Sequence, residues 1–132
     1  MKENLIPWND QFPTLSSHVF VAKGARIIGR VEIGEYSSVF YNAVLRGDIA
    51  SIKIGKRTNI QDNATVHLSS DRGVVIGDDV TIGHNAVVHA CTIESGSTIG
   101  MGAIIMDGAG VGVKTPVNRP TTIEEAGKLA KK

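Results

Sequence analysis

The feature that most constrains this chain is a six-residue repeat that runs through most of its length. A large aliphatic residue starts each hexapeptide, and glycine often follows it, as in Ile33-Gly34 and Ile82-Gly83. The aliphatic positions are Val21, Ile27, Ile33, Val39, Leu45, Ile54, Ile60, Val66, Ile76, Ile82, Val88, Ile93, Ile99, Ile105 and Val111. The residues four places further on are small or β-branched: Ala25, Val31, Ser37, Ala43, Ile49, Thr58, Ala64, Ser70, Val80, Ala86, Thr92, Ser97, Ala103, Ala109 and Thr115.

A period of six matches neither the 3.6-residue period of an α-helix nor simple alternation along one long strand. It indicates short strands joined by tight turns, with one hexapeptide on each side of a triangular solenoid and the aliphatic side chains stacked inside. Glycine suits the points where the backbone turns, and the 15 glycines and few aromatic residues agree. We therefore predict an all-β parallel β-helix of about five coils over residues 15–115.

The ends of such a solenoid need capping, and at 132 residues we expect residues 1–132 to form one domain. The segment 1–13, with Trp8 and Phe12, is a candidate cap. After the repeat, Thr122 and Glu125 fit a capping box, which predicts a short C-terminal helix over about 121–131.

Two histidines occupy equivalent places in successive coils. If three hexapeptides make one coil, Ile54, Ile60 and Val66 belong to one coil and Ile76, Ile82 and Val88 to the next, with the loop 69–73 absorbing extra residues. His67 and His89 each follow the third aliphatic, so they should stack about 4.8 Å apart at the backbone. His84 lies two residues after Ile82, on the preceding side, and should point elsewhere.

Two imidazoles this close can converge on one metal ion, and catalytic zinc takes three protein ligands and keeps an open position. A cyclic trimer would bring His84 of one subunit against His67 and His89 of the next. Taken singly, each histidine is more simply a solvated polar residue of its strand. His18 lies outside the pattern and is expected to be structural or exposed. The single Cys91 cannot form an internal disulfide; it is either a buried repeat residue or a fourth metal ligand.

Polar residues gather around these histidines in the sequence. With Leu45, Ile60 and Ile82 stacked on the face of His84, we expect Arg46 and Gln61 to share one offset, since each comes one residue after its stacked aliphatic. Asp62 and His84 share another offset, since each comes two residues after its aliphatic. Asp62 can then orient a ligand histidine or hold a guanidinium across a subunit boundary.

The motifs LRGD (45–48), NIQD (59–62), His67 and GHNAVVH (83–89) resemble the signature of γ-class carbonic anhydrases, over about residues 10–112. These are hexapeptide-repeat proteins with a left-handed parallel β-helix, an exception to the right-handed crossover rule. The resemblance implies a homotrimer with intersubunit metal sites formed by His67, His84 and His89. It also implies zinc, with iron or cobalt as alternatives, and reversible hydration of carbon dioxide to bicarbonate by a metal-bound hydroxide.

The resemblance assigns further roles to the polar residues. Arg46 and Asp48 resemble residues that tie neighbouring subunits together near the metal. Gln61 and Asn59 resemble amides that position the hydroxide or bicarbonate, although Asn59 can equally be a turn residue. With Asp62, these two amides complete the predicted catalytic set.

Two departures from the family keep other functions open. Some members carry acidic loops that shuttle protons, whereas the loop 49–53 after Asp48 has no carboxylate. Members usually add further coils and a long helix, whereas the repeat here fades after Val111. The alternatives are a hexapeptide-repeat acyltransferase that uses acyl-CoA with a histidine base, and a metal-binding scaffold without catalysis.

Composition adds exclusions. A net charge of +1 predicts neither a nucleic-acid partner nor an acidic membrane surface. Polar residues follow Met1-Lys2, and no apolar run approaches transmembrane length, so we expect no signal peptide and a cytoplasmic location.

Overall fold

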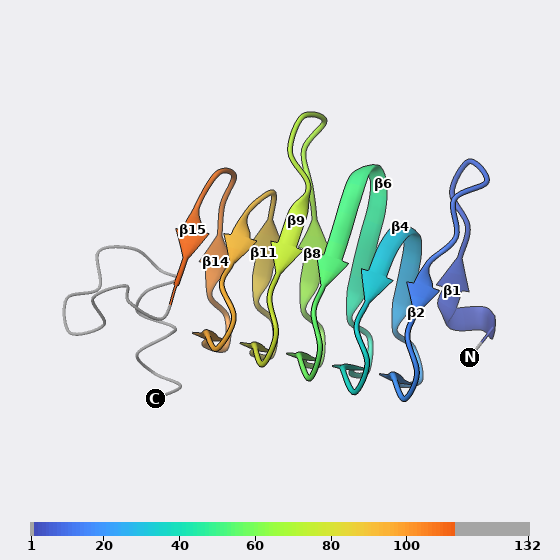
Figure 1. Cartoon of the computed structure of the whole chain (residues 1–132), viewed down its shortest axis with the longest axis horizontal. Helices are drawn as coiled ribbons and strands as arrows, with labels where there is room; N and C mark the ends of the chain where they lie inside the picture. The colour runs from blue at the N-terminus through green and yellow to red at the C-terminus, as the bar shows by residue number, and fades with distance from the viewer. Residues whose placement is uncertain (1, 113–132) are drawn as a thin grey trace.

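The computed structural model describes residues 2–112, which form a left-handed parallel β-helix, as predicted. The coils stack along the long axis of the molecule, with the N-terminal coil at one end and β15 at the other (Figure 1). A 3₁₀ turn, η1 (Lys2–Asn4), precedes the strands. All the strand pairings between named strands are parallel.

The strands lie on three faces, and the long strands β4 and β6 each run across two of them. The first face holds β1 (Leu5–Ile6), the start of β4 (Arg26–Ile33), the start of β6 (Val44–Ile54), β8 (Thr65–His67), β11 (Val87–His89) and β14 (Ile104–Ile105). The second holds β2 (Thr14–Leu15), the ends of β4 and β6, β9 (Val74–Ile76), β12 (Thr92–Ile93) and β15 (Gly110–Val111). The third holds β3 (Phe20–Val21), β5 (Ser38–Val39), β7 (Asn59–Ile60), β10 (Thr81–Ile82) and β13 (Thr98–Ile99).

The repeat aliphatics fill the interior, which confirms the predicted core. All of them from Ile27 to Val111 are buried, and Val21 is partly buried at the N-terminal end. An alanine ladder packs beside them at one corner: Ala25, Ala43, Ala64, Ala86 and Ala103. At the same corner, Asn42, Asn63 and Asn85 have φ of 62°, 63° and 62°. Asparagine tolerates this left-handed conformation better than most residues do, so it lets the chain turn there.

Three of the residues that lie four places after an aliphatic do not lie in the core. Ile49, Ser70 and Thr92 are exposed, and the core positions at this corner belong instead to Ile52, Val74 and Cys91. Each of these three buried residues lies two places before the next aliphatic. The spacing between aliphatics departs from six here, so counting forward from the previous aliphatic fails where counting back from the next one succeeds.

The N-terminal segment adds to the end of the solenoid, as predicted, but through different side chains. β1 and β2 pair with β4, and Leu5 and Leu15 pack against the core. Trp8 and Phe12 are exposed instead. The predicted helix over 121–131 lies outside the described residues, and the predicted extent of the domain stays a prediction. Within residues 2–112, no helix is long and apolar enough to cross a membrane.

Candidate metal centre

Strands β8 and β11 place His67 and His89 side by side on the first face, as predicted. The two strands pair in parallel with Val66 opposite Val88 and His67 opposite His89. The imidazole centroids lie 5.5 Å apart, with the ring planes inclined by 56°. Because Val66 and Val88 are buried in the stacked core, the backbone that carries the ring pair is held in place.

A buried carboxylate holds His67. Asp48 Oδ1 lies 3.1 Å from His67 Nε2 and accepts a hydrogen bond from the Ile49 backbone at 2.8 Å, and Asp48 Oδ2 accepts one from Arg46 Nη1 at 2.7 Å. The Asp48 side chain is only 5% exposed. Burial by itself raises the pKa of Asp48, but the hydrogen bonds from Ile49, His67 and Arg46 together outweigh it, so this pKa lies below its usual range.

The second histidine of the pair, His89, also contacts a carboxylate that was not predicted from the sequence. Asp107 Oδ1 lies 2.5 Å from His89 Nδ1. Asp107 follows β14, which pairs with β11 so that Val88 lies opposite Ile105. The signal that could have found it is the alignment of the next coil on this one, because Ile105 follows Val88 by 17 residues and Asp107 comes two places after Ile105.

His84 lies on a different part of the coil, as predicted. It follows β10 on the third face, and its Nδ1 lies 3.2 Å from Asp62 Oδ1, one coil below. The prediction that Asp62 sits beside His84 is therefore confirmed. His84 is 44% exposed. Within the described part of a single chain, no three His, Cys, Asp or Glu side chains gather closely enough to hold a metal ion.

The predicted position of Arg46 is wrong. Leu45 stacks with Val66 on the first face, whereas Val39 stacks with Ile60 on the third. Arg46 therefore follows its aliphatic on the first face, as His67 and His89 do, whereas Gln61 follows Ile60 on the third face. The cause is the extra residues in β6: Gly29 of β4 pairs with Gly47, but Val31 pairs with Ile52, so the added length lies after Leu45. These extra residues include Asp48, the carboxylate that reaches His67.

The two candidate amides follow each other along the third face. Asn59 lies in β7 and donates from Nδ2 to Ser38 Oγ at 2.7 Å, so it is a strand residue and not the turn residue that was the alternative. Gln61 comes directly after β7, and its Oε1 is buried without a hydrogen-bond partner among the described residues. A buried amide oxygen without a hydrogen-bond partner destabilises the fold, unless a ligand donates a hydrogen bond to it.

The remaining candidates have structural environments. His18 stacks on Tyr36, with ring centroids 4.9 Å apart and planes inclined by 6°. Cys91 is buried within the hydrophobic core cluster, which fits the buried-repeat interpretation.

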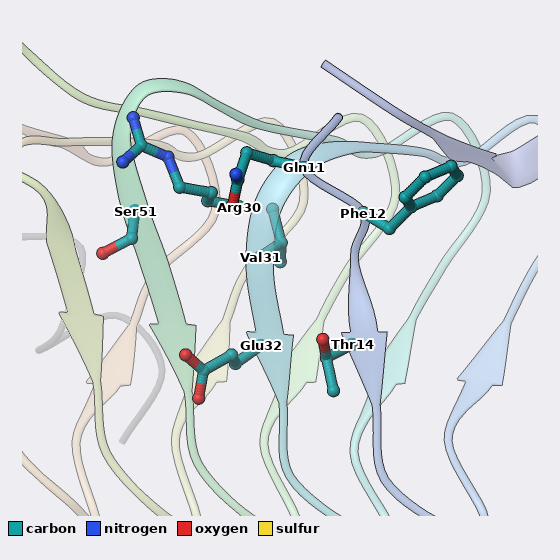
Figure 2. A pocket seen from close by; sticks show the side chains of 7 residues that line it. All are labelled: Gln11, Phe12, Thr14, Arg30, Val31, Glu32 and Ser51. Atoms are coloured by element: carbon teal, nitrogen blue, oxygen red, sulfur yellow. The ribbon is translucent and has the colours of Figure 1, made fainter. Parts of the chain in front are cut away.

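A shallow pocket lies away from the histidines, near the N-terminal end. Its volume is about 190 Å³. Figure 2 shows the residues that line it, which come from the chain before β2, from β2, from β4 and from β6: Gln11, Phe12, Thr14, Arg30, Val31, Glu32 and Ser51. Arg30 donates to the backbone oxygens of Asp48 and Ile49 at 3.1 and 2.9 Å. This guanidinium therefore supports the β6 corner that carries Asp48.

Comparison with known proteins gives consistent relatives. Residues 73–107 match the family described as "Bacterial transferase hexapeptide (six repeats)". Gamma carbonic anhydrase 2, mitochondrial, of Arabidopsis thaliana is 47% identical over 105 residues, covering 75% of this chain and 38% of that protein. The probable carbonic anhydrase of Methanocaldococcus jannaschii is 54% identical over 91 residues, covering 69% of this chain and 57% of that protein. The chain thus spans less than two thirds of these curated relatives.

A solved structure has the same fold. The hexapeptide transferase family protein from Anaplasma phagocytophilum superposes with a TM-score of 0.74 at 39% identity, covering 85% of this chain and 76% of that chain.

Proposed function

Because the chain belongs to the γ-class carbonic anhydrase-like family of hexapeptide-repeat proteins, we propose that it is a trimeric metalloprotein that reversibly hydrates carbon dioxide to bicarbonate. The observation that carries this proposal is the in-register pair of His67 and His89, with His84 on the adjoining face. Such an arrangement leaves each chain with an incomplete ligand set that a neighbouring copy of the same chain can complete.

The donor set fits a divalent metal. His84 and His89 each turn Nδ1 toward a carboxylate, so Nε2 remains to ligate, which is the usual carboxylate–histidine arrangement around zinc. His67 differs because its Nε2 faces Asp48, so ligation through that atom requires Asp48 to turn toward Arg46. Three neutral imidazoles with an open position suit zinc, and iron or cobalt are compatible.

When bound, such a metal lowers the pKa of a ligated water to about 7 and supplies hydroxide near neutral pH. The orphaned Gln61 oxygen can accept a hydrogen bond from the hydroxyl of bicarbonate, and Asn59 presents a second amide two residues earlier in the same strand region. Asp62 orients His84. Arg46 is 49% exposed, so its guanidinium can reach across a subunit boundary while still paired with Asp48.

The test is metal content per chain, by plasma mass spectrometry on untagged protein purified without added metal. The expected value is near one zinc, iron or cobalt per chain, with carbon dioxide hydration that disappears on chelation and returns on reconstitution. Protein that stays metal-free after reconstitution would overturn the proposal. Residues 49–53 lie in strand β6 and not in the loop expected from the sequence, and they carry no carboxylate to pass protons to solvent. We therefore expect slow turnover that exogenous buffer accelerates.

The substitution His84→Ala should abolish stoichiometric metal while leaving the β-helix folded. His84 is 44% exposed and outside the core, so the free energy of unfolding should change by less than about 0.5 kcal/mol. Metal analysis and circular dichroism on the same sample check this. Full metal occupancy in the variant would contradict the shared site.

Acyl transfer is the second candidate, favoured by the match to the transferase hexapeptide family and the similarity to a hexapeptide transferase family structure. Acyl-CoA binding and acyl transfer that persist after chelation would identify it. Stoichiometric metal with neither activity would identify a metal-binding scaffold.

We propose a cytoplasmic location, to be tested by cell fractionation.

A further inference from the structure

The acidic residue Asp107 lies on the corner directly above His89, one coil toward the C-terminal end. Its Oδ1 is 2.5 Å from His89 Nδ1. The backbone holds this corner in place, since Gly108 N donates to Ala90 O at 2.7 Å and Ala90 N donates to His67 O at 2.9 Å. Asp107 is thus set against His89 by the same ladder that stacks the histidine pair.

A neutral imidazole has one protonated nitrogen, and a hydrogen bond to one nitrogen decides which it is. With a carboxylate at Nδ1, the proton stays there and the lone pair is left on Nε2. We infer that Asp107 is a positioning residue for the metal site: it holds His89 as the Nδ1–H tautomer and leaves Nε2 as the metal donor. Only one part of this inference rests on the proposed function, namely that Nε2 of His89 binds a metal ion.

The contact between His89 and Asp107 contributes little to the stability of the fold. The His89 and Asp107 side chains are 31% and 49% exposed, and exposed ion pairs contribute little to folding. Nor does Asp107 repeat the role of Asp48, which is buried and faces Nε2 of its histidine. A partner that fixes the tautomer of a ligand histidine typically changes metal affinity by about 10–100-fold.

The experiment compares Asp107→Asn and Asp107→Glu with the wild-type chain. Asp79→Asn is the matched control, because Asp79 is an exposed carboxylate that pairs with Arg57 away from the histidines. Nitrogen-15 NMR of labelled histidine in metal-free protein reports the tautomer, with His89 assigned from His89→Gln. Competition with a chromophoric chelator gives the zinc dissociation constant.

In the wild type we expect the Nδ1–H tautomer at His89. Asp107→Asn should lose this tautomer at His89 and bind zinc about 10–100-fold more weakly. Asp107→Glu should retain part of the tautomer preference and part of the zinc affinity, and Asp79→Asn should match the wild type in both. A wild-type His89 protonated at Nε2, or unchanged zinc affinity in Asp107→Asn, would overturn the inference. Wild-type protein without zinc would overturn the proposed function instead, while the tautomer in the metal-free protein would still decide what Asp107 does to His89.

Discussion

The three site histidines each contact a carboxylate, but they do not offer the same ring nitrogen. His84 and His89 present Nδ1 to Asp62 and Asp107, whereas His67 presents Nε2 to Asp48. The side chain of Asp48 is also the most buried of the three carboxylates. At the scale of single residues, Asp48 therefore serves the fold as well as the site.

Replacing Asp48 with asparagine should lower the free energy of unfolding by about 1–3 kcal/mol, because a buried acceptor of charge-assisted hydrogen bonds is lost. Since the folded pKa of Asp48 lies below its ordinary 3.8, its contribution is present above that value and is lost as pH falls through the folded pKa. The difference between wild type and variant should accordingly be full at pH 7 and shrink in strong acid. Urea denaturation across pH checks this.

The control for this prediction is Asp79→Asn, which removes an exposed pair with Arg57. An exposed pair contributes little, so we expect a smaller change than for Asp48→Asn. Equal losses in the two variants would contradict the structural role of Asp48.

At the scale of elements, each face is a ladder of short strands whose inward side chains stack from coil to coil. Ile60 of β7 lies between Val39 of β5 and Ile82 of β10, and all three are fully buried. Ile49, in the extra residues of β6, is 55% exposed. The ladder thus buries Ile60, which starts a hexapeptide, and leaves Ile49, which lies four places after Leu45, exposed.

The substitution Ile60→Ala should lower the free energy of unfolding by about 2–5 kcal/mol, because it leaves a cavity between coils that cannot fully collapse. Ile49→Ala makes the same chemical change at the surface and should cost less than about 0.5 kcal/mol. Denaturant midpoints of the two variants, measured side by side, check this. A costly Ile49→Ala would show that this corner is covered in the assembled protein.

At the scale of the whole molecule, the solenoid separates the ligands that it does not stack. His67 and His89 share the first face, while His84 follows the third, across the corner of Asn63 and Asn85. A rigid coil cannot bring these positions together within one chain. The proposed site therefore depends on a second copy, and the 14.0 kDa chain should sediment as a trimer.

Mixed trimers test the shared site directly. His84→Ala retains the stacked pair, and the double variant His67→Ala/His89→Ala retains only His84. Each alone should lack stoichiometric metal. Co-expressed in equal amounts, they should recover about one quarter of the wild-type content, because about three quarters of randomly mixed trimers are heterogeneous and each has one complete interface of three. Metal analysis of the mixture checks this, and no recovery would exclude ligands from neighbouring subunits.

Much of the fold could be predicted because a solenoid stacks equivalent residues of successive coils on one another. The period placed the interior aliphatics, and aligning the aliphatics of successive coils, with the loop 69–73 set aside, put His67 opposite His89 and Asp62 beside His84. Counting in sixes does not reach Asp107 from His89, because the coil from Val88 to Ile105 has 17 residues and not 18.

Counting could not place residues next to insertions, where the chain can add length on either side of a corner without changing the pattern of aliphatics. Strand pairing alone decided that Leu45 stacks on Val66 and that the added residues of β6 carry Asp48 beneath His67. The sequence by itself thus determined the repeating core and the stacked histidines, because each histidine directly follows the third aliphatic of its coil. The tertiary structure decided the positions of Arg46 and Asp48, because hydrogen-bonded register between coils depends on where the extra backbone is accommodated.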